Sequence, residues 1–217
     1  MSKTYEDFYD EVLPYVPGCT PALAKVAIRN AVIDFCEGSL ILQRDHDPVT
    51  VLQNTIDYDF EPPTGYLVTK LMKAWYKGVE LQPVAPDEVP SVQLYNARYP
   101  DAVKSVNDPQ VITQKDERTY AIFPFPKETA AAALTMRVAL KPTRASTTIE
   151  DVIYEDYAEV MGHGAKYRLM SSPNKPYSDG NGAGASRAFF EEGINTARQR
   201  ATRGYVRSDL RVKLLKV

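Results

Sequence analysis

The chain has 217 residues, of which 44% are apolar and 25% are charged, and its formal net charge is −2. This composition is typical of a globular protein with one large domain or two small ones, and the balanced charge excludes a polycation that coats nucleic acid. No run approaches the roughly 20 apolar residues of a membrane span, and the start, MSKTYEDFYDEV, lacks the cationic and apolar regions of a signal peptide.

The first forty residues predict two helices. Thr4 is placed to cap a short helix over residues 5–13, with Asp7 in the capping-box position. Thr20-Pro21 starts the second helix, since a capping hydroxyl is followed by proline at the first helical position. This helix extends to Cys36, and its apolar stripe is wide enough for burial on two sides. The stripe consists of Leu23, Val26, Ala27, Ile28, Ala31, Val32, Ile33 and Phe35.

From about residue 47 the apolar pattern changes to that of strands. We predict strands over 49–52, 56–60, 66–76 and 79–82, with Lys77-Gly78 as the turn between the last two. A proline-rich link leads to a weakly helical stretch that ends near Arg98. Residues 110–114 and 119–123 form a hairpin around KDER. The clearest half-buried strand covers 134–140, where large apolar residues alternate with small or polar ones.

Helical spacing returns after Ile149 and predicts one helix ending near Ser171 and another over about 185–203, stopped by Gly204. The order of helices, strands and helices predicts an α+β fold, in which an antiparallel β domain is inserted into a discontinuous helical domain. The predicted boundaries are 1–46 and 145–204 for the helical domain, 47–144 for the β domain, and 205–217 for an extended C-terminal tail.

A glycine-rich stretch, DGNGAGASRAFF over residues 179–190, raises the possibility of a phosphate site. A dinucleotide fingerprint needs a third glycine where Ala185 stands, and a P-loop needs a lysine followed by serine or threonine, which is absent. The preceding residues are polar and proline-rich rather than a strand. We therefore interpret the stretch as a flexible lead-in to the last helix.

Other candidates for chemistry are few. Asp45-His46-Asp47 has three metal-capable side chains, but neighbours in an extended segment point to opposite faces, so a solvated turn is favoured. His163 lies between Gly162 and Gly164, which favour close helix packing, and Glu159 is its i, i+4 partner in a structural contact. Cys19 and Cys36 show no metal-type spacing and no disulfide framework, which favours synthesis in a reducing cytoplasm. We expect no enzyme activity and no cofactor, although an enzyme that uses phosphate or a metal remains a third hypothesis.

The two ends of the chain differ in charge. Acidic residues dominate 1–20, whereas 197–217 contains seven lysines and arginines against Asp209 alone, which favours contact with a partner or a symmetry mate. The segment YVRSDLRVKLLKV after Gly204 holds apolar residues that would be unfavourable in water, so we expect it to dock on another chain. The candidate partner-binding residues are Arg203, Tyr205, Arg207, Leu210, Arg211, Val212, Lys213, Leu214 and Leu215. The alternative is a nucleic-acid-binding module that uses Arg198, Arg200, Arg203, Arg207 and Arg211.

Several motifs, in their order, resemble the head–tail connector or adaptor proteins of tailed bacteriophages. LPYVPGC over residues 13–19 leads to a helix that ends in AVIDFCE at 31–37, which resembles the opening of that family. AWYKG at 74–78 resembles its hairpin, and VALKP at 138–142 resembles its last strand. EDY at 155–157 and NKPYSD at 174–179 resemble further elements, with Tyr177 where tryptophan is common.

This resemblance implies a structural virion protein at the head–tail interface, similar to the tail tubular or adaptor proteins of short-tailed phages and synthesised in the host cytoplasm. Its implied partners are other copies of itself in a dodecameric ring, the portal protein, and a tail nozzle or tail tube protein. Double-stranded DNA would pass through the ring without sequence-specific binding. By this analogy the helical domain builds the ring wall and the C-terminal tail engages the portal.

Overall fold

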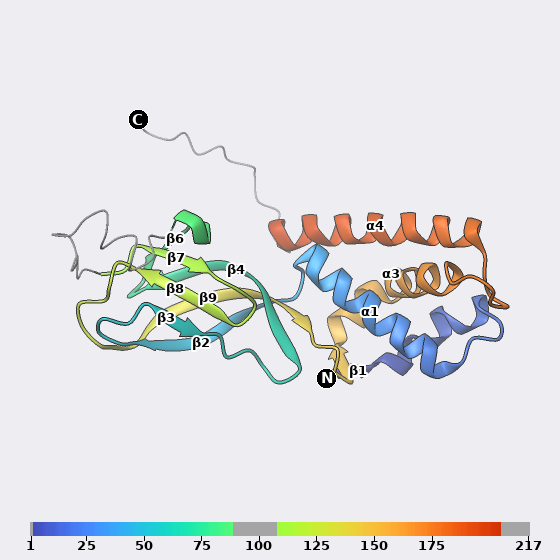
Figure 1. Ribbon diagram of the computed structural model, residues 1–217, viewed down its shortest axis with the longest axis horizontal. Helices are drawn as coiled ribbons and strands as arrows, with labels where there is room; N and C mark the ends of the chain where they lie inside the picture. Colours follow the sequence, from blue (N-terminus) through green and yellow to red (C-terminus); the bar gives the residue numbers. More distant parts are fainter. Residues whose placement is uncertain (1, 89–107, 205–217) are drawn as a thin grey trace, which may run out of the picture. The chain divides into compact units, whose positions relative to one another are not determined.

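The computed structural model describes residues 2–88 and 108–204, and these form an α+β fold (Figure 1). The described residues divide into two compact units. The β unit contains the described part of 1–4 and 42–150, and the helical unit contains 5–41 and the described part of 151–217. The sequence predicts the boundaries between the helical and β domains at 46/47 and 144/145. The residue contacts in the structure divide the two units at 41/42 and 150/151. The N-terminal strand also belongs to the β unit.

The β unit contains two four-stranded sheets and one two-stranded sheet. The first sheet has the order β2-β9-β4-β5, with β2 at Gln43–Val51, β9 at Ala130–Pro142, β4 at Tyr66–Tyr76 and β5 at Val79–Glu80. The second has the order β3-β8-β7-β6, with β3 at Asp57–Asp59, β8 at Thr119–Phe123, β7 at Val111–Gln114 and β6 at Gln82–Pro83. The third pairs β1 at Ser2–Thr4 with β10 at Thr148–Glu150. A short 3-10 helix, η3, covers Pro86–Glu88.

Strand β9 follows the predicted alternation from Leu134 to Val138, but Ala139, predicted on the opposite face, is also buried. Leu134, Met136 and Val138 are buried, and Thr135 and Arg137 between them are exposed. Its neighbour β4 has the predicted bounds, but register shifts interrupt its pairing with β9 in two places. Each shift adds a residue to one strand, so the buried positions of β4 are spaced mostly by three instead of two. Those positions are Val68, Leu71, Ala74 and Tyr76.

The helical unit is built from three α-helices that contact one another, with two 3-10 helices beside them (Figure 1). The α-helices are α1 at Pro21–Ser39, α3 at Asp151–Met170 and α4 at Gly180–Arg203; the 3-10 helices are η1 at Tyr5–Glu11 and η2 at Leu13–Tyr15. Helix α1 begins after Thr20 with proline in its first turn, as predicted, although the Thr20 hydroxyl makes no capping hydrogen bond. Helix α4 ends before Gly204, also as predicted.

Glycines allow the helices to approach closely. A Cβ on Gly164 of α3 would lie 2.6 Å from the Phe190 ring of α4 and 2.8 Å from the Ala31 methyl of α1. A Cβ on Gly162 would lie 2.7 Å from Glu11 of η1. These distances are below normal van der Waals contact, so only glycine fits at either position. The structure thus confirms that the glycines beside His163 permit close helix packing.

Several local predictions are wrong. Residues 5–11 form a 3-10 helix, and Thr4, the predicted cap, lies in strand β1 because its backbone pairs with Thr148. The predicted turn at 45–47 is part of β2, because Asp45 and His46 pair with β9. The predicted burial of α1 on two sides holds for one side only, since Leu23 and Val26 are exposed. The predicted weak helix near Arg98 lies outside the described residues.

Candidate interaction surfaces

The predicted partner-binding residues fall mostly outside the structure. Arg203 is exposed in the last turn of α4. The remaining candidates lie outside the described residues: Tyr205, Arg207, Leu210, Arg211, Val212, Lys213, Leu214 and Leu215. Their role therefore stays a prediction.

Two arginines of the nucleic-acid alternative make contacts inside the helical unit. Arg198 donates from Nε to the Gly38 carbonyl at the end of α1, at 2.8 Å. Arg200 lies 2.9 Å from an Asp156 carboxylate oxygen and donates to the Tyr157 hydroxyl at 3.3 Å. A side chain that satisfies a helix carbonyl or pairs with a carboxylate contributes less to phosphate binding. These contacts disfavour the nucleic-acid module.

The histidine of the Asp45-His46-Asp47 candidate is a structural residue. His46 is buried, and its Nδ1–H donates to the Asp47 carbonyl at 2.7 Å while Nε2 accepts from the Glu61 backbone N–H at 3.0 Å. Both ring nitrogens are used by the backbone, so neither has a lone pair for a metal. A hollow of about 380 Å³ adjoins this site. Among residues 2–88 and 108–204 no group of three metal-capable side chains is arranged to hold an ion.

The glycine-rich stretch forms the start of α4, so the predicted flexible lead-in is wrong. Gly180, Gly182 and Gly184 lie within the first turns, and Asp179 caps the helix by accepting from the Asn181 N–H at 3.1 Å. A strong N-cap explains why the helix begins five residues earlier than the apolar pattern indicated. The Asp179 carboxylate also occupies the position in which a phosphate would bind, and its charge repels an anion.

A groove between α3 and α4 is a surface that sequence reasoning missed. It has a volume of about 460 Å³ and is lined by acidic, apolar and aromatic side chains. The lining residues are Asp156, Tyr157, Glu159, Val160, His163, Phe189, Glu192, Gly193 and Thr196. The spacing of Asp156, Glu159 and His163 on α3 could have indicated one exposed face. These α3 residues form a groove with α4 only because the two helices pack, and the residues that pack are about thirty positions apart in the sequence.

His163 contacts both walls of this groove. Its Nε2 lies 4.0 Å from a Glu159 carboxylate oxygen, which confirms the predicted i, i+4 contact, and its ring centroid lies 4.9 Å from that of Phe189. Burial, followed by the nearby Lys166 ammonium, lowers the pKa of His163 below the usual value near 6.5. The imidazole is thus held neutral at pH 7 and packs as an aromatic side chain.

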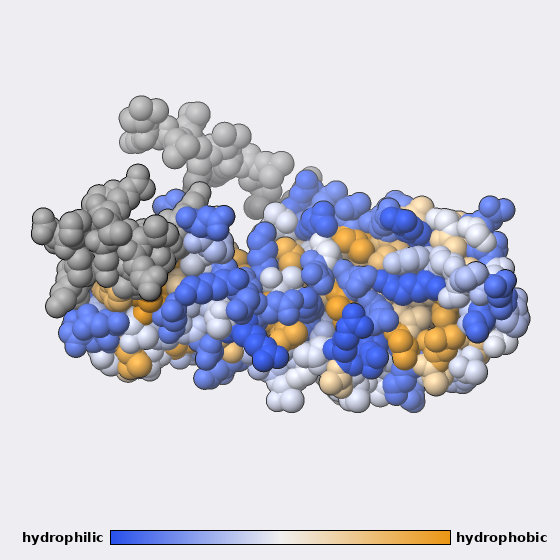
Figure 2. Space-filling model, in the orientation of Figure 1, coloured by the Kyte–Doolittle hydropathy of each residue, from blue (hydrophilic) through white to orange (hydrophobic). Residues whose placement is uncertain are grey.

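Exposed apolar side chains gather on the helical unit. Leu23 and Val26 of α1 are each 41% exposed, and Phe189 of α4 is 57% exposed. Figure 2 shows hydrophobic surface over the part of this unit where Figure 1 draws the N-terminal half of α1. Leu23 and Val26 lie on one face of α1, and exposed apolar side chains that share a face mark an interaction surface.

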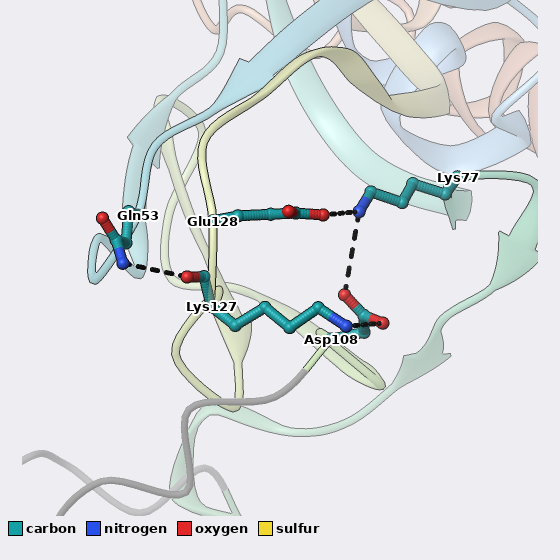
Figure 3. Close-up of polar contacts among 5 residues, drawn as sticks. All are labelled: Gln53, Lys77, Asp108, Lys127 and Glu128. Atoms are coloured by element: carbon teal, nitrogen blue, oxygen red, sulfur yellow. Dashed lines mark hydrogen bonds and ion pairs between the residues drawn. The ribbon is translucent and has the colours of Figure 1, made fainter.

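A network of charged side chains connects loops at one end of the β unit (Figure 3). Lys77 in the β4–β5 turn lies 2.5 Å from Glu128 and 3.9 Å from Asp108, and Lys127 lies 3.1 Å from Asp108. Gln53 donates from Nε2 to the Lys127 carbonyl at 2.9 Å. Four segments far apart in the sequence are thus connected. The side chains are largely exposed, so the network contributes to loop position more than to stability.

No helix of the described residues is long and apolar enough to cross a membrane. The family model described as SU10 adaptor protein matches residues 3–212. The chain belongs to the SU10 adaptor protein family. This is a family of bacteriophage head–tail adaptors, so the chain is a structural adaptor and a virion component, and the resemblance to phage connectors is confirmed. A search of the curated proteins found no match.

Proposed function

We propose that this adaptor assembles into a dodecameric ring that joins the portal to the tail or nozzle and lets double-stranded DNA pass. The observation that carries the proposal is the family match, which extends over both units and over most of the C-terminal segment. In this proposal the ring contacts DNA through the walls of its channel without reading sequence. A conduit that bound DNA tightly would slow its passage.

The helical unit forms the ring wall in this proposal. Leu23, Val26 and Phe189 supply apolar contact area that an isolated subunit leaves in water. Burying such side chains favours association by about 25 cal/mol for each Å² of apolar surface, before the entropy of association is subtracted. The exposed apolar residues therefore support subunit contacts in the helical unit.

The C-terminal segment, residues 205–217, engages the portal in this proposal. It contains six aliphatic residues, Val206, Leu210, Val212, Leu214, Leu215 and Val217, among four cations. Apolar residues that alternate with charged ones suit a strand added to a partner sheet or an extended peptide in a groove.

Native mass spectrometry of the full chain, alone and mixed with the portal from the same source, tests the function. We expect a complex with the mass of one portal and a full ring of adaptors. An adaptor that leaves the portal unbound under all conditions would contradict the proposal.

Deletion of residues 205–217 tests the role of the segment. We expect the truncated chain to keep its far-ultraviolet circular dichroism and to lose portal affinity by at least about tenfold, which corresponds to 1.4 kcal/mol. A chain in which Leu210, Leu214 and Leu215 are replaced by serine retains the length and charge, and it separates apolar docking from charge attraction. A truncated chain that folds and binds the portal as tightly as the full chain would refute this role.

A further inference from the structure

The groove between α3 and α4 is lined by both acidic and apolar side chains. Glu159 is exposed over 83% of its side chain, and Glu192 lies across the groove from it on α4. Val160 and Phe189 supply the apolar part of the lining. Asp156, a third carboxylate of the lining, is paired with Arg200. The chemistry of this groove therefore suits an occupant that presents apolar side chains and a cation.

The outer face of α1 has those properties. Leu23 and Val26 lie three residues apart, on one side of the helix, and Arg29 follows Val26 by three. Within the part of the chain that the structure describes, no carboxylate lies within 4.0 Å of the Arg29 guanidinium, and its Nε is buried and makes no hydrogen bond. The next cation on α1, Lys25, is already paired with Glu6 at 2.8 Å. Arg29 is half-buried, and its charge has no carboxylate partner among the described residues.

The two surfaces lie on opposite sides of the helical unit. On α3, Arg168 binds Asp34 of α1, and Glu159 is nine residues away, which is about half a turn around the helix. On α1, Phe35 packs against Tyr157 of α3 with ring centroids 4.9 Å apart, and Val26 is again nine residues away. Each surface therefore points away from the contact between α1 and α3. The α1 face and the α3–α4 groove of one copy cannot meet each other.

We propose that the outer face of α1 in one copy docks in the α3–α4 groove of the next copy. Leu23 and Val26 then pack against Val160 and Phe189, and Arg29 pairs with the carboxylates of the groove. This inference depends on the proposed ring, and it identifies the interface that repeats between neighbouring copies in that ring. Two different surfaces on opposite sides of one subunit form a heterologous contact, which closes a ring when the rotation between copies permits.

Charge opposes the symmetric arrangement in which two grooves meet. Packing groove against groove would bring Glu159 and Glu192 near the same carboxylates of the second copy. Like charges brought together in an interface oppose association, whereas the heterologous contact pairs opposite charges.

Disulfide cross-linking of the full chain on the portal tests the contact. In a Cys19→Ser background, with the buried Cys36 left in place, the double variant Val26→Cys and Phe189→Cys should form a ladder of cross-linked oligomers on oxidation. Each single variant should give none, and an equimolar mixture of the two singles should stop at dimers. The matched control pairs Phe189→Cys with Leu52→Cys, which is an exposed leucine of the β unit. It should give no ladder.

Charge reversal provides a second measurement. Glu159→Lys changes an exposed side chain, so it should fold normally and reduce the ring population by at least about tenfold. Addition of Arg29→Glu to this variant should restore assembly.

These outcomes separate the inference from the proposed function. A wild-type chain that never assembles on the portal refutes the function. If the wild-type chain forms a ring on the portal, any of three results would refute the interface alone. These are a double-cysteine variant that gives no ladder, a Val26→Cys variant that cross-links to itself, and a Glu159→Lys variant that still forms the ring.

Discussion

Replacement of Gly164 by alanine tests the packing of the helical unit. Alanine stabilises a helix interior by about 1 kcal/mol relative to glycine, so the change should be favourable if the site were open. The added methyl would instead lie 2.6 Å from the Phe190 ring and 2.8 Å from the Ala31 methyl. Carbon atoms pack best at about 3.5–4.0 Å, so α3 must move by about 1 Å relative to both neighbouring helices.

Overpacking of this kind costs about 1–3 kcal/mol. Because two buried groups are displaced at once, we take the upper part of that range, which leaves a net loss of about 2 kcal/mol for Gly164→Ala after the gain in helix propensity. Gly184→Ala is the matched control, since nothing lies within 4 Å of its added methyl. It should gain about 0.5–1 kcal/mol because Gly184 lies inside α4.

Urea unfolding followed by circular dichroism at the helix band measures both free energies. Opposite signs for the same chemical change are the expected result. A Gly164→Ala chain at least as stable as the wild type would refute the close packing of α1, α3 and α4. A Gly184→Ala chain without any gain would contradict the helical start of α4 at Gly180.

Two further predictions concern buried polar side chains. The Tyr120 hydroxyl is buried without a hydrogen-bond partner, and burial raises its pKa, so Tyr120→Phe should be neutral or stabilising by up to about 1 kcal/mol in urea unfolding. Tyr58→Phe is its control: that hydroxyl accepts from the Leu52 N–H, so its removal should cost about 1 kcal/mol, and equal effects would contradict this reasoning. The folded-state pKa of His163 is lowered, so below about pH 6.5 the unfolded chain binds more protons than the folded chain. The free energy of unfolding should therefore decrease as the pH is lowered through that region. His163→Gln should make the fall smaller between about pH 7.5 and 5.5, and an unchanged slope would show that another group is responsible.

The sequence alone was sufficient for several structures that depend on near neighbours. The alternation at 134–138, the hairpin around KDER and the start of α1 at Thr20-Pro21 each follow from a local period or a local cap. The family could also be identified from the order of short motifs, because order along the chain needs no knowledge of contacts.

The tertiary structure decided the features that depend on distant residues. His46 could be excluded as a ligand only once the Glu61 backbone was seen to use its second ring nitrogen. The interruptions in β4 depend on its pairing with β9, some 65 residues later in the chain. The α3–α4 groove arises because Gly193 lets α4 approach Val160 of α3. A surface made from two helices exists only after they pack, since each helix alone presents its side chains to water.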